Sequence, residues 1–418
     1  MNVGIDYYKI NPMKCNIFRQ IPPTAGLPIR LKDIFLPAGD NLTLEEGLRE
    51  YLNAVDIWVT YSGTAALYII LESLKEVSGK RTVIIPSFVC PLVPLAIHRA
   101  GLKIEICDIN GFDFNFNQDE LERIVSINRD ILAIIPVYLG GLPLDYDKIE
   151  NIASPNNIFI IEDCAQSLGA EYKGKKLGTL GDFGFFSFCR GKGLTIYEGG
   201  AISCNNKEYT PIIDKKIKAL AKNDFFSETI KIIELFGYWL FYRPYLFWFV
   251  FGLPQAFWNL LGKKDKANIE YFDINFPIHK VSGFRKKAGR AGFFRIDKEI
   301  AKQREKASFY IEKLDGMTGI RVIKEKGPAR SNYPFVTLIF DDAEKREKVI
   351  ARLRSSGLGV SEIYGLPVTG YDYLQKIVPL KDCPGAKFIC EREVTLSTSN
   401  FIKKCEMEEV VKNILTLT

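Results

Sequence analysis

Lys192 stands between two glycines in "CRGKGLT", directly after the apolar run "GFFSF" at residues 184–188. Glycine lets the backbone follow a tight path, so this stretch predicts a short loop that presents a single amine. A lysine between glycines is most often part of a basic turn on the surface. Only the surrounding residues can show whether Lys192 has a chemical role instead. A lysine amine that is fixed in a loop can form a Schiff base with an aldehyde and can move protons.

Two further stretches have the residues to hold a phosphate group. "YSGTAAL" at residues 61–67 follows an apolar run and opens a helical pattern, so Gly63 and Thr64 would expose backbone N–H groups at a helix N-terminus. Ser187 ends the run that precedes Lys192, where its hydroxyl could join them. Taken alone, these features are an ordinary helix cap and a buried strand serine.

A carboxylate completes the set. "IIEDCAQ" at residues 160–166 ends an apolar run in Asp163, which would favour a cation such as a protonated ring nitrogen, although a solvated acid is the simpler interpretation. A phosphate site, an acid for a ring nitrogen and a loop lysine together indicate one ligand, pyridoxal 5′-phosphate (PLP). Such a cofactor would also give acid–base and electrophilic power to a chain with only two histidines.

The elements that must position these residues alternate between short apolar runs and helical segments. Seven runs have the character of strands, at residues 57–61, 82–86, 104–109, 131–138, 158–163, 184–188 and 200–204. Because they are almost wholly apolar, they predict an α/β fold with a mostly parallel sheet between helices. Ligands of such sheets bind at the carboxyl ends of the strands, which is where Asp163 and Ser187 lie.

The character of the chain changes near residue 290. A long charged helical stretch leads into the apolar run "FVTLIF" at residues 335–340 and then into a second charged helical stretch. We expect residues 1–290 to form a large α/β domain and residues 291–418 to form a smaller C-terminal one.

Composition excludes several classes of protein. The 418 residues carry 56 basic and 50 acidic side chains, and the net charge of +6 is too small to indicate nucleic acid binding. Nine cysteines form no CxxC pair and several lie in apolar runs, as reduced thiols do in the cytoplasm. With so few histidines we expect no metal site. The N-terminal residues lack the apolar region of a signal peptide.

Residues 225–262 interrupt the α/β pattern. Within them, residues 235–261 hold 12 aromatic side chains and a single charge, Arg243, and lysines follow at once. The stretch is long enough to cross a bilayer, but its two prolines would break a straight helix. Dense aromatic residues beside lysines favour attachment at a membrane interface. The alternative is an aromatic lid that packs on the protein or on a dimer partner.

The sequence resembles the DegT/DnrJ-type sugar aminotransferases, which are PLP-dependent enzymes of fold type I. The resemblance rests on "SGTAAL", "VIIPSF", "AIIPVYLGGLPLD", "IIEDCAQSLGAEYKGKKLGTLGDFGFFSF", "KGL" and "EGGAIS", and more weakly on "CPGAKFICEREVTLST". It covers residues 45–205 closely and residues 280–418 loosely. The length of the stretch from Glu162 to Ser187 argues against a chance match.

The resemblance implies roles by position. Lys192 would form the Schiff base, Asp163 would face the ring nitrogen, and Gln166 would lie against the ring or its hydroxyl. Glu198 would belong to the wall of the active site. The residues implied to hold the phosphate are Gly63, Thr64 and Ser187.

The chain departs from the family pattern in four places. Cys90 occupies the position of the aromatic residue that stacks on the ring, so either Phe88 takes over or a smaller group covers the cofactor there. Arg190 and Gly191 replace the usual Pro-Thr or Pro-Ser before the lysine, and Arg190 could supplement the phosphate site. The asparagine that a partner subunit normally supplies is missing from "FPIHKVSGF", and the aromatic insert has no counterpart in the soluble relatives.

We therefore expect a PLP-dependent aminotransferase that converts a keto sugar, carried on a nucleotide or a membrane lipid, to an amino sugar for surface polysaccharide, with glutamate as donor. Two alternatives stay open: a transaminase of a non-sugar carbonyl, and a membrane-surface regulatory or scaffold protein that has lost the chemistry. The resemblance implies a homodimer. We expect a cytoplasmic location, peripheral on the inner face of the cytoplasmic membrane if the insert binds lipid.

Overall fold

A seven-stranded sheet forms the centre of the N-terminal part of the molecule. The structure is a computed structural model that describes residues 19–36, 40–250, 252–254, 257, 261 and 272–417. The strand order is β1-β9-β8-β5-β4-β2-β3. The strands are β1 Asp56–Thr60, β2 Thr82–Pro86, β3 Lys103–Cys107, β4 Ile131–Ile134, β5 Phe159–Asp163, β8 Phe183–Ser187 and β9 Gly200–Cys204. Each of the seven predicted runs is a strand of this sheet.

Most neighbouring strands of the sheet run parallel. The pairs β2–β3, β2–β4, β4–β5 and β5–β8 are parallel, whereas β9 is antiparallel to both β8 and β1. Strands β2, β4 and β9 are buried along their whole length, as their apolar sequences predict. Because β9 returns directly beside β8, the residues between them form one loop, and that loop carries Lys192.

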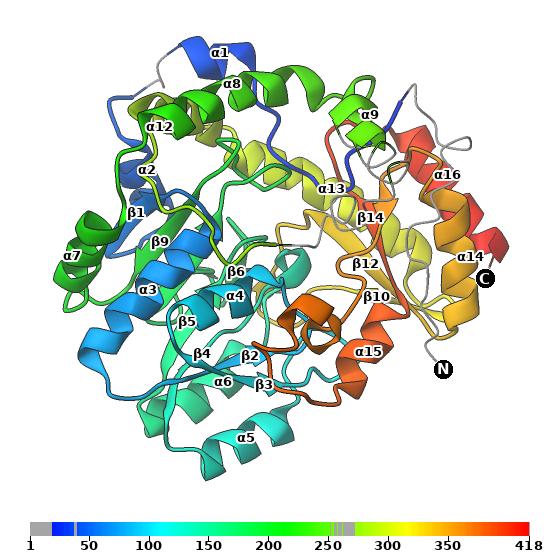
Figure 1. Ribbon diagram of the computed structural model, residues 1–418. Coiled ribbons are helices and arrows are strands. Elements are labelled where there is room, and N and C mark those ends of the chain that lie inside the picture. Colours follow the sequence, from blue (N-terminus) through cyan, green and yellow to red (C-terminus); the bar gives the residue numbers. More distant parts are fainter. Residues whose placement is uncertain are drawn as a thin grey trace.

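Helices cover both faces of this sheet (Figure 1). The connections from β1 to β2 and from β2 to β3 carry α3 and α4. The connections from β3 to β4 and from β4 to β5 cross the sheet in the opposite direction and carry α5 and α6. Since parallel crossovers are right-handed, the two sets lie on opposite faces. The N-terminal helices are α1 Leu31–Phe35, α2 Leu44–Leu52, α3 Gly63–Val77, α4 Leu92–Arg99, α5 Gln118–Ile127, α6 Tyr146–Ala153 and α7 Thr210–Leu220.

A second sheet, of four antiparallel strands in the order β10-β12-β14-β13, organises the C-terminal part. Its strands are β10 Ile320–Ile323, β12 Phe335–Phe340, β13 Val360–Ser361 and β14 Glu393–Ser397. The accompanying helices are α13 Ile296–Leu314, α14 Ala343–Leu353, α15 Pro384–Cys390 and α16 Lys404–Leu417. The two sheets fall on either side of residue 291, and the division into domains at that residue stays a prediction.

Two features tie the sheets together. A small sheet pairs β6 Glu171–Tyr172 with β7 Lys175–Lys176 and with β11 Ala329–Arg330 from the C-terminal part. The first described residues also cross over: the Ile21 N–H donates to the Gly357 carbonyl at 2.8 Å, and Arg19 pairs with Glu406 at 2.8 Å. Neither link was predicted from the sequence, because each joins residues that are far apart in the chain.

The aromatic insert forms α8 Phe225–Phe241 and α9 Phe247–Val250, and α8 lies near α1 and α12 Gly283–Phe293 (Figure 1). One side of it packs on the protein: Leu235, Tyr238 and Tyr242 are buried against Ile29 and Ile34. The other side is exposed. Residues 251, 255–256, 258–260 and 262 of the insert lie outside the described residues. In the described part of the chain, no helix combines the length and the apolar character needed to cross a bilayer.

Candidate active site

Three strand ends meet where the sequence predicts a phosphate site. The register places both Thr60 and Ser187 opposite Gly200, so β1 and β8 end level with each other on the two sides of β9. Immediately after β1, Ser62 caps helix α3 and its Oγ accepts the Ala65 N–H at 3.0 Å. The N–H groups of Gly63 and Thr64 precede the first bond within the helix, so they are free to serve an anion.

Glycines shape this corner. A Cβ on Gly200 would lie 2.5 Å from the Gly63 nitrogen, so only glycine lets β9 approach the turn before α3. A Cβ on Gly63 would meet the Phe186 carbonyl oxygen at 3.2 Å and the Ser187 Cβ at 3.3 Å. The predicted phosphate residues Gly63 and Ser187 are therefore in close contact, with Thr64 next to them in α3.

Asp163 ends β5 and is 4% exposed. Its Oδ1 accepts the Ala165 N–H at 3.0 Å. Burial raises the pKa of this carboxyl to about 6, while the hydrogen bond from Ala165 and the charge of Lys192 act in the opposite direction. A carboxylate that is buried beside a single amine is suited to a cationic ring nitrogen.

Glu162, one residue earlier, has a different role. Because side chains alternate along a strand, it lies on the opposite face from Asp163. Its carboxylate is fully buried and accepts the N–H groups of Gly178 at 2.9 Å, Leu180 at 2.7 Å and Gly181 at 2.9 Å. It also accepts the hydroxyl of Tyr138 at 2.9 Å. Glu162 thus fixes the loop that leads into β8, a structural role that sequence reasoning missed.

Lys192 lies in the loop between β8 and β9, close enough to Asp163 and Cys90 that its charge lowers the pKa of both. Its N–H donates to the Cys189 carbonyl at 3.3 Å, which closes a turn. Gly191 has φ +74°, a left-handed conformation that glycine adopts without strain. The predicted tight loop is present, and it brings the amine to the end of β5.

Cys90, and not Phe88, lies beside Asp163 and Lys192. The Phe88 side chain is 1% exposed and packs on Phe114 and Tyr364, with centroids 6.0 Å and 5.3 Å away. Burial raises the pKa of the Cys90 thiol to about 11, so it is neutral near pH 7. Of the two alternatives for the ring-stacking position, the geometry favours the smaller group.

Gln166 and two loop residues complete the surroundings. The Gln166 Oε1 accepts the Gly140 N–H at 2.8 Å, which fixes the orientation of the side-chain amide. Arg190 lies over the Tyr197 ring, 5.4 Å from its centroid, so its cation already has a partner. Glu198 forms an ion pair of 2.8 Å with Lys231 of α8, so this predicted wall residue is held by the insert.

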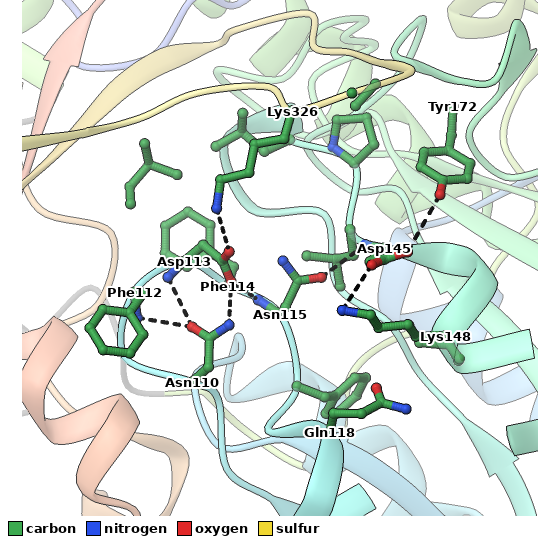
Figure 2. A pocket seen from close by; sticks show the side chains of 18 of the residues that line it. Asn110, Phe112, Asp113, Phe114, Asn115, Gln118, Asp145, Lys148, Tyr172 and Lys326 are labelled. Carbon is green, nitrogen blue, oxygen red and sulfur yellow. Dashed lines mark hydrogen bonds and ion pairs between the residues drawn. The ribbon is translucent and has the colours of Figure 1, made fainter. Parts of the chain in front are cut away.

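A cavity of about 630 Å³ lies elsewhere, between the segments that follow β3 and β4 and residues 323–329. Figure 2 shows that its charged groups face one another: Lys326 pairs with Asp113 at 3.1 Å and Lys148 with Asp145 at 3.1 Å. None of the predicted site residues lines this cavity. Because it contains none of those residues, it is not the candidate active site.

The residues at the strand ends fit PLP. The helix N-terminus at Gly63 offers free N–H groups to a phosphate, and buried Asp163 offers a negative charge to a ring nitrogen. A solved structure titled a putative sugar aminotransferase Spr1654 from Streptococcus pneumoniae, in its PMP form, shares this fold with a TM-score of 0.73 and 20% identity over 94% of this chain and 98% of that one. Fold and site define the class: a PLP-dependent aminotransferase of fold type I.

The chain belongs to the DegT/DnrJ/EryC1/StrS aminotransferase family, whose profile matches residues 33–228 and 280–415. The UDP-4-amino-4,6-dideoxy-N-acetyl-beta-L-altrosamine transaminase of Campylobacter jejuni is 28% identical over 387 residues, 89% of this chain and 90% of that protein. The GDP-perosamine synthase of Escherichia coli O157:H7 is 25% identical over 322 residues, 77% of this chain and 74% of that protein. The unmatched residues between the two ranges include most of the aromatic insert.

Proposed function

We propose that this aminotransferase converts a nucleotide-linked keto sugar to the corresponding amino sugar, with glutamate as the amino donor, for surface polysaccharide. One observation carries the proposal: two relatives, each matched over most of its length, are named for products on UDP-linked and GDP-linked sugars. A lipid carrier, the other carrier that the sequence leaves open, has no such support.

We propose the following roles for the residues at the strand ends. PLP, when bound, supplies an aldehyde that captures amino groups and a ring that accepts electrons from the carbon being deprotonated. The N–H groups of Gly63 and Thr64 and the Ser187 hydroxyl would donate to its phosphate. Asp163 would hold a proton on the ring nitrogen, since a buried carboxylate favours a neighbouring cation.

Lys192 would carry the proton that moves during the reaction. Its Nζ would bind the cofactor at rest and, once the substrate has displaced it, would take a proton from the substrate carbon and return it to the cofactor side. The Gln166 amide nitrogen is left as a donor, because its oxygen already accepts from Gly140, and would orient the ring hydroxyl. The neutral Cys90 thiol would cover one face of the ring without adding charge.

The test is a two-stage assay on purified protein loaded with PLP. Glutamate should convert the visible band of the lysine-bound cofactor to the amine form, and a UDP- or GDP-linked keto sugar should restore that band. Restoration by simple keto acids alone would favour the transaminase of a non-sugar carbonyl. A folded protein with no visible band would favour the regulatory or scaffold alternative and end the proposal.

We also propose that the active form is a homodimer. The proposal rests on membership of the family, since a second subunit usually completes sites of fold type I. Light scattering across a range of protein concentrations gives the mass directly. A monomer that retains full activity would refute this proposal.

A peripheral membrane contact is a separate proposal, supported by the apolar outer side of α8. Its inner side buries Leu235 and Tyr238, together with the Glu228 carboxylate, which pairs with buried Arg285. Its outer side is an apolar stripe at helical spacing, made of Phe226, Ile230, Ile233 and Leu240. The most exposed of these, Phe226 and Ile233, are 75% and 65% exposed. Surface helices normally place their apolar side inward.

Neighbouring elements extend this apolar stripe. Phe35 of α1 contacts Phe236 with ring centroids 5.6 Å apart and is itself 63% exposed, and Phe249 of α9 is 49% exposed. At the start of α8, exposed Lys222 and Lys280 are joined by a backbone hydrogen bond of 2.9 Å. An uncharged aromatic surface with cations at its border matches an anionic phospholipid surface.

Sedimentation with vesicles tests this contact. The protein should bind vesicles that contain anionic phospholipid more strongly than neutral ones, and F226S/I233S should weaken binding. I127S is the matched control, since Ile127 is 71% exposed on α5. No binding by the wild type would refute the proposal, and a change of oligomeric state in F226S/I233S would instead identify the stripe as a subunit interface.

A further inference from the structure

The backbone of the lysine loop is held by groups that lie outside the sheet. The Gly191 N–H donates to the Tyr238 hydroxyl at 3.3 Å, and the Gly191 carbonyl accepts the Thr24 hydroxyl at 2.9 Å. The Lys192 carbonyl accepts the Leu27 N–H at 3.2 Å. The peptide groups on both sides of the lysine are therefore tied to residues 24–27 and to α8.

The Tyr238 side chain is itself firmly placed. It is 6% exposed, and its ring stacks on that of Tyr242, with centroids 4.4 Å apart and an angle of 23° between the planes. Burial raises the pKa of its hydroxyl well above the ordinary value, so the group stays neutral. A Cβ on Gly26 would lie 2.9 Å from the Gly191 Cα and 3.3 Å from the Tyr238 hydroxyl, which shows how closely the three residues pack.

A loop with a glycine on each side of its lysine needs such support. Glycine has more backbone freedom than any other residue, so the sequence between Arg190 and Leu194 does not by itself fix where the amine lies. The chain also lacks the proline that precedes this lysine in the family pattern and that would stiffen the loop. External hydrogen bonds replace that local rigidity.

We propose that Tyr238 is a positioning residue for Lys192: through the Gly191 N–H, the insert helix α8 sets where the amine lies. The proposal rests on the proposed role of Lys192 and goes beyond it, because it assigns a task to a segment that the family profile does not match. Thr24 holds the carbonyl of the same residue, Gly191. The inner side of α8 thereby acts on the chemistry without touching the reacting atoms.

Y238F is the informative change, because it removes the hydroxyl and keeps the ring that stacks on Tyr242. Without its partner the Gly191 N–H should exchange with deuterium at least about tenfold faster, since the hydrogen bond no longer protects it. In the PLP-loaded protein, the pH midpoint of the visible band should shift, and the glutamate half-reaction should slow by about tenfold. Y310F is the control, because Tyr310 is fully buried in α13 and its hydroxyl has no hydrogen-bond partner.

The outcomes are separable. Unchanged exchange at Gly191 and an unchanged pH midpoint in folded Y238F would overturn the inference, as would equal shifts in Y310F. If Y238F does not fold, T24V removes the hydroxyl that bonds the carbonyl of the same residue, Gly191, and the pH midpoint and the rate of the half-reaction are measured in that variant. Absence of a visible band in the wild type would refute the proposed role of Lys192, while exchange at Gly191 would still report whether Tyr238 holds the loop.

Discussion

The two sides of the lysine loop come from different parts of the chain. The groups on the sheet side lie within the ranges that match the family, and they are Gly63, Cys90, Asp163 and Ser187. The groups that hold the loop backbone from the other side lie outside both ranges, and they are Thr24, Leu27 and Tyr238. The residues suited to the chemistry thus lie in the part of the chain that the family profile matches, whereas the residues that hold the loop backbone lie outside that part.

The largest effect is expected on the residue that both sides share. K192A should lower the turnover number by about 10³-fold or more, because it removes both the nucleophile and the group that moves the proton. The visible band of the PLP-loaded protein, and its trapping by borohydride, should be absent from the variant. If K192A retained the visible band and its trapping by borohydride, Lys192 would not be the Schiff-base lysine. The comparison between the two sides of its loop would then also fail.

D163N acts on the sheet side and should change two properties in opposite directions. Its Oδ1 can still accept the Ala165 N–H, so the structure is preserved while the charge is lost. PLP binding should weaken by about 10- to 100-fold above pH 6. Wild-type binding should weaken as the pH falls through about 6, where Asp163 takes up a proton, and this pH dependence should disappear in the variant.

D163N should weaken PLP binding but should stabilise the cofactor-free protein. Burial gives Asp163 a higher pKa in the folded chain, about 6, than in the unfolded chain, so its ionisation favours unfolding. The contribution of this group to stability is therefore lost as the pH rises from about 4 to 6. Cofactor-free D163N should melt at a higher temperature than the wild type at pH 8. Equal melting temperatures would mean that the carboxylate is compensated in another way.

G191A tests the opposite side of the loop and should have a moderate effect. Gly191 has φ +74°, and a Cβ there would lie 2.7 Å from the Thr24 hydroxyl oxygen. The left-handed conformation costs about 1–2 kcal/mol for a residue with a side chain. We expect a slower glutamate half-reaction, with PLP still bound through the sheet side. If G191A lowers PLP affinity as much as D163N does, the two sides of the lysine loop do not act independently on cofactor binding and on the reaction.

The smallest effect is expected at the outer side of α8. I233S changes a side chain that is 65% exposed and points away from the lysine loop, so the visible band and the half-reaction should match those of the wild type. Spectra recorded beside those of Y238F would show whether the two sides of one helix act independently. A slower half-reaction in I233S would show that they do not.

The sequence predicts the sheet side well, and local patterns explain why. Each of the seven strands corresponds to a short apolar run in the sequence. Asp163 and Ser187 are the last residues of two of these strands, which is why the sequence places them in the candidate site. The turn before α3 is visible in the spacing of small residues. The choice between Phe88 and Cys90 at the ring-stacking position needed the structure, because these residues are two positions apart and have different surroundings.

The other side of the loop could not be predicted in this way. Thr24 and Gly191 are separated by 167 positions and meet only when the N-terminal segment returns from the C-terminal sheet. The composition of the aromatic insert does not show that α8 buries one side, with Leu235 and Tyr238, and exposes an apolar stripe on the other. Tyr238 and Tyr242 are four residues apart on one side of the helix, and that spacing was the available signal.

The buried carboxylate at the end of β5 has a consequence for the lifetime of the protein. In the proposed assignment, Asp163 keeps its full electrostatic cost until a cationic ring nitrogen arrives, so the folded state is strengthened by its own cofactor. Newly made chains that meet a shortage of vitamin B6 would unfold more often and would be degraded sooner. The supply of the cofactor would then set the amount of the enzyme as well as the fraction that is active.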